Sequence, residues 1–213
     1  MDALVMCGGR GTRLRGDTDD GRGIEATEKP LVEIGGVSMF DRVVDALSGS
    51  QIGRSEAGEG TIRAVVSPNA PATAERARER SLPVVETPGE GYVDDLNTAL
   101  EAVGRPVLTV PADLPLLAPE HVDDAVERAR SAHSSATAEP EPTSLTVCVP
   151  AALKRRLGAS LDTAFDHGGR SVAPTGLNVV GGDDDTVALT YDARLAVNVN
   201  RPEDVALAED LCE

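Results

Sequence analysis

The sequence predicts an α/β fold, with a mainly parallel sheet and helices on both of its faces. Two observations lead to this prediction. Short apolar runs alternate with amphipathic segments along the 213 residues, which is the pattern of βαβ units. The length suits one well-buried core and is too short for two comfortable ones. We therefore expect a single domain over residues 1–213, with polar inserts near 15–27, 48–60 and 133–143.

The expected elements follow from periodicity and from Gly and Pro boundaries. Apolar runs predict strands over residues 3–6, 62–66, 82–86, 107–110, 145–149, 172–180 and 187–191. Apolar residues at helical spacing predict helices over 39–47, 72–80, 93–103, 119–132, 151–157 and 202–211. Ser38 is expected to cap the first helix, and the insert 48–60 to be a flexible surface connection. The three aspartates at 183–185 follow two glycines, so we expect a solvated hairpin tip rather than a metal cluster.

The chain is strongly acidic, with a formal net charge of −16 and a sequence pI near 4.5. Such a field disfavours nucleic acid and anionic membranes as partners. Lys29 and Lys154 are the only lysines, and the other 18 basic residues are arginine. This composition is typical of proteins from salt-loving archaea, while an arginine-rich mesophilic protein from a GC-rich genome is the alternative.

Cysteine use and hydropathy indicate the compartment. Cys7, Cys148 and Cys212 have no paired spacing, which suits a reducing cytosol better than a disulfide framework. No apolar run reaches membrane-spanning length, and the start shows no signal-peptide pattern. The three histidines share no motif with one another or with a cysteine, so neither a zinc site nor Ser-His-Asp or Cys-His catalysis is expected. We expect a cytoplasmic protein.

A glycine-rich turn directly after the first apolar run is the principal candidate site. Glycines let main-chain N–H groups approach a phosphate closely, while a threonine hydroxyl and an arginine fork add donors. The residues expected to bind phosphate there are Gly8, Gly9, Arg10, Gly11, Thr12 and Arg13. Lys29, fixed by Pro30, supplies a second cation, so the site would be locally basic within an acidic protein.

Asp113 is the second anchor of the predicted site. It follows the buried run 107–110 and stands between two prolines, at the sheet edge where α/β proteins bind ligands. Magnesium prefers carboxylate and phosphate oxygens and keeps several waters, so one well-placed aspartate suffices when a triphosphate supplies the rest. We expect Asp113 to hold Mg²⁺; a helix cap or turn former is the structural alternative.

The pattern GGxGTR followed by KP fits neither a Walker A loop nor a dinucleotide fingerprint, because Gly-Lys-Ser/Thr and the third glycine are missing. It resembles the nucleoside-triphosphate transferase family, which includes the sugar-phosphate and molybdenum cofactor nucleotidyltransferases. Within the family the chain is most similar to archaeal guanylyltransferases that act on a phosphorylated corrinoid. That similarity rests on MDALVMCGGRGTRL at the start and on the segments 88–97, 174–180 and 198–209.

The resemblance implies a Rossmann-like nucleotidyltransferase fold and adds further site residues. Gly91 and Tyr92 would lie beside the nucleotide; a packed turn with Tyr92 as a hydrophobic anchor is equally open. Gly176 and Asn178 would line the acceptor half of the cleft. Either Asn200 or Asn198 would approach metal or phosphate, or else cap the last helix. The basic run 154–156 could meet an acidic substrate, but we favour a solvated helix face.

The implied reaction transfers GMP from GTP to adenosylcobinamide phosphate and releases pyrophosphate. Such a transfer needs positioning and charge neutralisation more than a protein nucleophile. Arg13, Lys29 and Asp113 would be its catalytic residues, with Mg²⁺ as cofactor. The expected partners are GTP, the phosphorylated corrinoid and possible further copies of the chain in a homodimer. The alternatives are a molybdenum cofactor guanylyltransferase and an inactive nucleotide-binding regulatory module.

Overall fold

The computed structural model describes residues 1–9, 14, 27–54, 60–131, 142–182 and 184–212. Its main sheet has eight strands, seven of them in the order β10-β7-β9-β6-β1-β4-β5, with β8 paired to β9. The strands are β1 (Asp2–Met6), β4 (Ile62–Val66), β5 (Val84–Glu86), β6 (Val107–Pro111), β7 (Ser144–Pro150), β8 (Phe165–His167), β9 (Arg170–Val180) and β10 (Asp185–Leu189). A separate small hairpin pairs β2 (Glu33–Ile34) with β3 (Val37–Ser38).

The pairing confirms a mostly parallel, mixed sheet. β1 runs parallel to β4 and β6, β4 runs parallel to β5, and β7 runs parallel to β10. β9 is antiparallel to β6, β7 and β8, so it alone runs against the other seven strands. The expected hairpin after β9 is wrong, because β7 lies between β9 and β10 in the sheet. Asp184 and Asp185 are nevertheless exposed, and Asp185 begins β10.

Six α-helices and two short 3-10 helices are present in the described part of the chain. They are η2 (Lys29–Leu31), α1 (Met39–Gly49), α2 (Pro71–Glu79), α3 (Tyr92–Val103), α4 (Pro119–Ser131), α5 (Ala151–Leu157), η3 (Ala193–Ala196) and α6 (Pro202–Asp210). The cap predicted for α1 is confirmed, since the Ser38 hydroxyl accepts a hydrogen bond from the Asp41 amide at 3.1 Å. The expected helices lie within one or two residues of these bounds.

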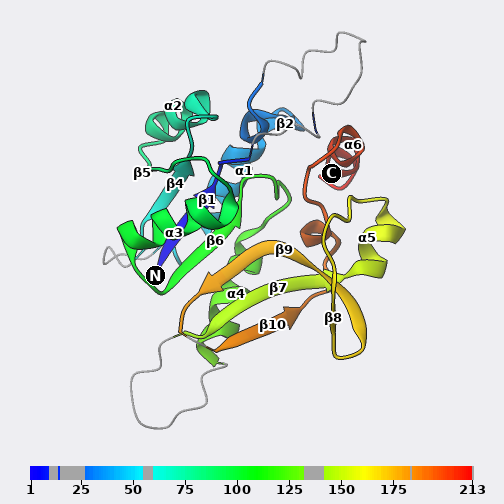
Figure 1. Ribbon diagram of the computed structural model, residues 1–213. Helices are drawn as coiled ribbons and strands as arrows, with labels where there is room; N and C mark the ends of the chain where they lie inside the picture. Colours follow the sequence, from blue (N-terminus) through cyan, green and yellow to red (C-terminus); the bar gives the residue numbers. More distant parts are fainter. Residues whose placement is uncertain (10–13, 15–26, 55–59, 132–141, 183, 213) are drawn as a thin grey trace, which may run out of the picture.

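Helices cover both faces of the sheet (Figure 1). Side chains alternate along β1, so Ala3 and Val5 pack with the apolar faces of α1, α2 and α4. Leu4 and Met6 point the other way and pack with α3 through Ala99 and its partly buried neighbours. Aliphatic residues dominate these clusters, and Phe40 is the one aromatic residue in them. No described helix is both long and apolar enough to cross a membrane.

The beginning of the insert 48–60 is packed, which corrects the expectation of a flexible connection. Ser50 is fully buried, and its hydroxyl donates to the Leu47 carbonyl at 2.7 Å. Ile52 is also buried, and the Gln51 amide donates to Asp123 on α4 at 2.7 Å. The polar composition of the segment concealed these contacts. Residues 55–59, and most of the other two inserts, lie outside the described residues.

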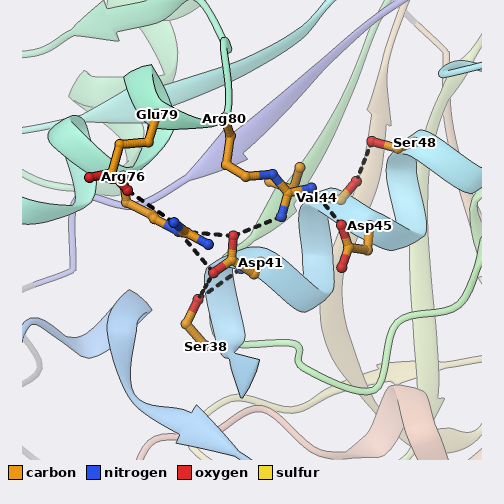
Figure 2. A network of polar contacts seen from close by, with 8 residues as sticks. All are labelled: Ser38, Asp41, Val44, Asp45, Ser48, Arg76, Glu79 and Arg80. Atoms are coloured by element: carbon orange, nitrogen blue, oxygen red, sulfur yellow. Dashed lines mark hydrogen bonds and ion pairs between the residues drawn. The ribbon is translucent and has the colours of Figure 1, made fainter. Parts of the chain in front are cut away.

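A cluster of charged side chains joins α1 to α2 (Figure 2). We call Ser38, Asp41, Asp45, Arg76 and Arg80 the arginine network. The Asp41 carboxylate accepts from Ser38 at 2.7 Å, from Arg76 at 3.0 Å and from Arg80 at 2.8 Å. Burial by itself would raise the pKa of Asp41, but these hydrogen bonds and the nearby guanidinium charges hold it below its usual value. The network therefore favours an ionised Asp41 between the two helices.

Candidate active site

The candidate site lies beside β1, at the point where later strands are added to the opposite side of the sheet. After β1 the chain passes to β4 on one side, whereas β6 pairs with β1 on the other side. In open α/β sheets the crevice at the carboxyl ends of such strands is the usual ligand site. Gly8 and Gly9 follow β1 after one intervening residue, and Asp113 comes shortly after β6. The two predicted anchors are therefore brought to the same edge of the sheet.

Gly8 is required by close packing. A Cβ atom at Gly8 would lie 2.6 Å from the Asp95 carboxylate on α3, well inside contact distance. Asp95 is only 3% exposed and accepts a hydrogen bond from the Gly89 amide at 2.8 Å. Gly89 itself has φ +76°, in the region that favours glycine. The glycine turn and the loop before α3 are thus held against each other through Asp95.

A cavity of about 490 Å³ opens beside this turn, within the size range of small-molecule sites. Its lining residues are Met6, Gly8, Gly9, Gly89, Glu90, Gly91, Tyr92, Asp95, Pro111 and Asp113. Tyr92 lines this cavity, and 47% of the residue is exposed. Desolvation raises the pKa of the Tyr92 hydroxyl, and the Asp113 charge acts in the same direction. We call this space the turn cavity.

Lys29 and Asp113 are in direct contact, although they are 84 residues apart in the sequence. The Lys29 ammonium donates to the Asp113 carboxylate at 2.5 Å and to the Asn200 side-chain oxygen at 2.8 Å. The side chains of Lys29 and Asp113 are 12% and 20% exposed. Gly9, Lys29 and Asp113 also line one small recess of about 40 Å³. The lysine is therefore placed between the glycine turn and the aspartate.

Glu28 fixes the segment that carries Lys29. Its carboxylate accepts from the Ala72 and Thr73 amides, both at 2.7 Å, and from the Thr73 hydroxyl at 2.6 Å. These amides are in the first turn of α2, which begins at Pro71 after Ala70, a residue whose side chain cannot cap. A carboxylate also suits the positive end of a helix. Sequence reasoning missed Glu28; the only local signal was a helix start without a capping side chain.

Asn198 and Lys154 continue the chain of hydrogen bonds from Asp113 away from Lys29. The Asn198 amide donates to Asp113 at 3.3 Å and to the Thr175 carbonyl at 2.8 Å. The Lys154 ammonium donates to the Asn198 side-chain oxygen at 3.0 Å. We call Lys29, Asp113, Asn198, Asn200 and Lys154 the lysine network. Neither asparagine side chain caps α6, whose N-cap residue is Arg201, so the cap alternative is wrong.

The expectation of a solvated basic face on α5 is wrong for Lys154. Lys154 is 3% exposed, whereas Arg155 and Arg156 are exposed. It lies three residues after the buried Ala151, so helical geometry turns both toward the protein. Desolvation lowers the pKa of Lys154, while the charges of nearby carboxylates, those of Asp204, Asp113 and Asp162, oppose that effect.

A second cavity of about 370 Å³ lies next to the lysine network, and we call it the asparagine cavity. Tyr92, Pro111 and Asp113 border it as well as the turn cavity. Its other lining residues are Lys154, Ser160, Asp162, Thr163, Pro174, Thr175, Gly176, Asn178, Asn198 and Asn200. The four residues predicted for the acceptor side thus share one cavity, and Asp113 stands between the two spaces.

Gly176 has a structural reason to be glycine in addition to its place in that lining. Its φ is +89°, and a Cβ would lie 2.6 Å from the Pro111 ring. The Asn178 side-chain amide donates to the Gly176 carbonyl at 2.9 Å. The strand β9 can therefore approach the end of β6 closely at this point.

The oxygen atoms around Asp113 suit a hard cation such as Mg²⁺. Asp113 and Asn200 offer side-chain oxygens there, whereas Asn198 turns its amide nitrogen to Asp113 and its oxygen to Lys154. The described residues contain no group of three or more His, Cys, Asp or Glu side chains that could hold a metal. Mg²⁺ is commonly held by one or two carboxylates together with substrate phosphates. The residues fit that mode and do not form an all-protein cage.

Four predicted site residues, Arg10, Gly11, Thr12 and Arg13, lie outside the described residues. The remaining predicted residues line the two cavities or contact Asp113. The fold and the site together define a class: an α/β protein with two adjoining cavities, a glycine turn and a lysine–aspartate pair at the carboxyl edge of its sheet. These are the parts expected of an enzyme that binds a phosphorylated ligand.

Comparison with known proteins identifies the family. Residues 3–180 match the model of the MobA-like NTP transferase domain, and the chain belongs to that family. The chain is 30% identical to the adenosylcobinamide-phosphate guanylyltransferase of Methanocaldococcus jannaschii, over 99% of this chain and 97% of the relative. The structure of CMP:2-keto-3-deoxy-manno-octonic acid synthetase complexed with CTP matches 99% of this chain and 96% of its own, with a TM-score of 0.64 and 11% identity. The latter similarity confirms the nucleotidyltransferase fold.

Proposed function

We propose that this protein transfers GMP from GTP to adenosylcobinamide phosphate, forming adenosylcobinamide-GDP and pyrophosphate in cobalamin nucleotide-loop assembly. The assignment of substrates is supported by the full-length similarity to the Methanocaldococcus jannaschii guanylyltransferase. The observation that carries it is the Lys29–Asp113 contact on the border between two cavities. Two substrates that react with each other need two adjoining spaces, with charge neutralisation between them.

In the proposed reaction an acceptor phosphate oxygen forms a bond to the α-phosphorus of GTP. The bond from that phosphorus to the bridging oxygen breaks, and pyrophosphate leaves with the electron pair. The acceptor phosphate is already ionised at neutral pH, so no general base is required. Catalysis then depends on holding the reactants in line and stabilising the charge that develops.

The turn cavity would hold GTP. The Gly8 and Gly9 amides would bind its phosphates, and the Gly91–Tyr92 segment would lie beside base or ribose. Lys29 would exchange part of its contact with Asp113 for the α-phosphate, because an ammonium is a mobile point charge with three donors. Arg10, Gly11, Thr12 and Arg13, which follow Gly9 in the sequence, would complete the phosphate site by the role that the family resemblance implies.

Asp113 would bind Mg²⁺, with Asn200 or Asn198 nearby, and the ion would neutralise the triphosphate charge. The asparagine cavity would hold the acceptor, with Gly176 and Asn178 in its wall. Its connection to Asp113 through Asn198 supports this arrangement, since the acceptor phosphate must reach the α-phosphorus.

Pyrophosphate release provides the test. Purified protein with GTP and Mg²⁺ is expected to release pyrophosphate when adenosylcobinamide phosphate is added, and not with molybdenum cofactor as acceptor. GTP binding without pyrophosphate release would instead support a regulatory nucleotide-binding module. Release with the molybdenum cofactor alone would assign the protein to the other guanylyltransferase reaction.

A further inference from the structure

We propose that Lys154 binds the phosphate group of the acceptor, a phosphomonoester, in the asparagine cavity. This proposal rests on the proposed function and extends it to a residue that the predicted site did not contain. It assigns one lysine to each substrate: Lys29 to the nucleotide and Lys154 to the acceptor. The described structure joins the two lysines through Asp113 and Asn198.

The first support is where the chain uses lysine. Of 20 basic residues only two are lysine, and both belong to one network of five side chains. Ion pairs elsewhere in the described chain use arginine, apart from the His121–Asp192 contact. An ammonium on a flexible stem binds phosphate as a point charge and moves with it, whereas a guanidinium prefers a fixed planar geometry.

The second support is the incomplete hydrogen bonding of a buried charge. Lys154 is 3% exposed, and its ammonium carries three N–H donors. In the described part of the chain one partner is recorded for it, the Asn198 side-chain oxygen at 3.0 Å. A buried ammonium with donors to spare is costly unless an anion or water meets it. The asparagine cavity, which Lys154 lines, is the space from which such a partner could reach it.

The third support is the charge of the cavity itself. Asp113 and Asp162 line it, and Lys154 is the only basic residue among the described lining residues. Two carboxylates would repel a phosphomonoester, which carries close to two negative charges at neutral pH. Asp162 is paired with Arg201 at 2.9 Å, and Asp113 with Lys29. Lys154 is thus the cation positioned to attract the acceptor phosphate, and its contact with Asn198 directs that phosphate toward Asp113.

Steady-state kinetics with Lys154→Met tests this role, because methionine keeps most of the unbranched side chain and removes its charge. We expect the KM for adenosylcobinamide phosphate to rise by roughly 10-fold or more, the size of effect typical of a lost charge-assisted hydrogen bond. The KM for GTP should change less than about twofold. Arg155→Met, an exposed cation on the same helix, is the matched control and should leave both constants unchanged.

Lys154→Arg separates charge from packing, since it keeps the charge and should restore part of the acceptor affinity. An unchanged acceptor KM in Lys154→Met, or equal losses for GTP and acceptor, would overturn the proposal. A wild-type protein that binds GTP but releases no pyrophosphate with this acceptor would overturn the proposed function instead.

Differential labelling tests Lys154 in the wild-type protein without any turnover. Reductive methylation followed by mass spectrometry distinguishes the two lysines, because there are no others. In GTP-loaded protein, millimolar inorganic phosphate is expected to slow methylation of Lys154, while Lys29 is protected by GTP and shows no further change. Absence of phosphate protection at Lys154, with Lys29 protected by GTP, would contradict a phosphate site at this lysine.

Discussion

The arginine network and the lysine network each contain a central carboxylate and two cations, but in the lysine network only Lys29 contacts that carboxylate directly. In the arginine network, Asp41 accepts from two guanidiniums and a hydroxyl, and the Arg76 and Arg80 side chains are 40% and 28% exposed. In the lysine network the cations are more buried, and Asp113 borders two cavities. Rigid, saturated contacts suit the joining of two helices. Mobile ammonium groups beside open spaces suit ligands that arrive and leave.

The largest effect is expected from Lys29→Met. Loss of the cation proposed for the α-phosphate should lower kcat by about 100- to 1000-fold, as for other preorganised groups that stabilise developing charge. The melting temperature should also fall by a few degrees, because the partly buried Asp113 and Asn200 side chains lose their shared donor. Pyrophosphate release and thermal unfolding measure the two quantities.

The exposed Arg156→Met is the control for Lys29→Met, because it removes a cation outside both cavities. If Lys29→Met turned over at the wild-type rate, the lysine network would have no catalytic role that distinguishes it from the arginine network.

Asp41→Asn should show a loss of stability with little change in the chemistry of the folded protein. Removing a charged acceptor that several donors share costs about 1–3 kcal/mol. Because the pKa of Asp41 is lowered in the folded state, its contribution is present above the unfolded value near 3.8 and lost as pH falls below it. Urea unfolding at pH 7 and near pH 3 should show a wild-type advantage that shrinks in acid.

If the difference in unfolding free energy between the wild type and Asp41→Asn were as large near pH 3 as at pH 7, this explanation would be contradicted. A loss of kcat as large as that of Lys29→Met would show instead that the arginine network serves the reaction.

Glu28→Gln connects the two networks, because Glu28 caps α2, which carries Arg76, and precedes Lys29 in the chain. Loss of the charged cap should cost about 1 kcal/mol of stability. We also expect a decrease of several-fold in kcat at saturating GTP, since the segment that positions Lys29 is less firmly held. Glu33→Gln, an exposed acidic residue nearby, should change neither quantity.

Much of the fold could be predicted because its signals are local. Alternating apolar runs and helical spacing predicted the positions of the elements. The Ser38 cap could be predicted because the serine directly precedes the first helical residues. The glycine turn, Lys29 and Asp113 were recognisable from residue type and position at strand ends. Reversal of β9 was not predicted, since direction within a sheet depends on partners distant in the sequence.

The missed residues share that cause. Glu28 acts on amides more than forty residues away, which no local pattern reveals. Lys154 did carry two signals, its helical spacing from Ala151 and the scarcity of lysine, but two flanking arginines made the run resemble a solvated face. The packing of Ser50 and Ile52 was concealed because both lie within a polar, glycine-rich stretch.

The smallest effect concerns salt. With a net charge of −16, self-repulsion should be relieved by screening, so the melting temperature is expected to rise by several degrees between dilute buffer and molar KCl. The more exposed arginine network should lose part of its contribution over the same range, whereas the lysine network should not. Full stability in dilute buffer would remove the salt-adapted interpretation of the composition.

The proposed mechanism requires that the Lys29–Asp113 contact opens when GTP binds. Lys29 then binds a phosphate oxygen of the nucleotide, and Asp113 binds the metal. A crystal structure with GTP and Mn²⁺ in place of Mg²⁺ tests it most directly, because manganese is located by its anomalous scattering. We predict an anomalous peak at the Asp113 carboxylate and the Lys29 ammonium on a phosphate oxygen. GTP bound in the turn cavity with the metal elsewhere and the Lys29–Asp113 contact unchanged would contradict the account.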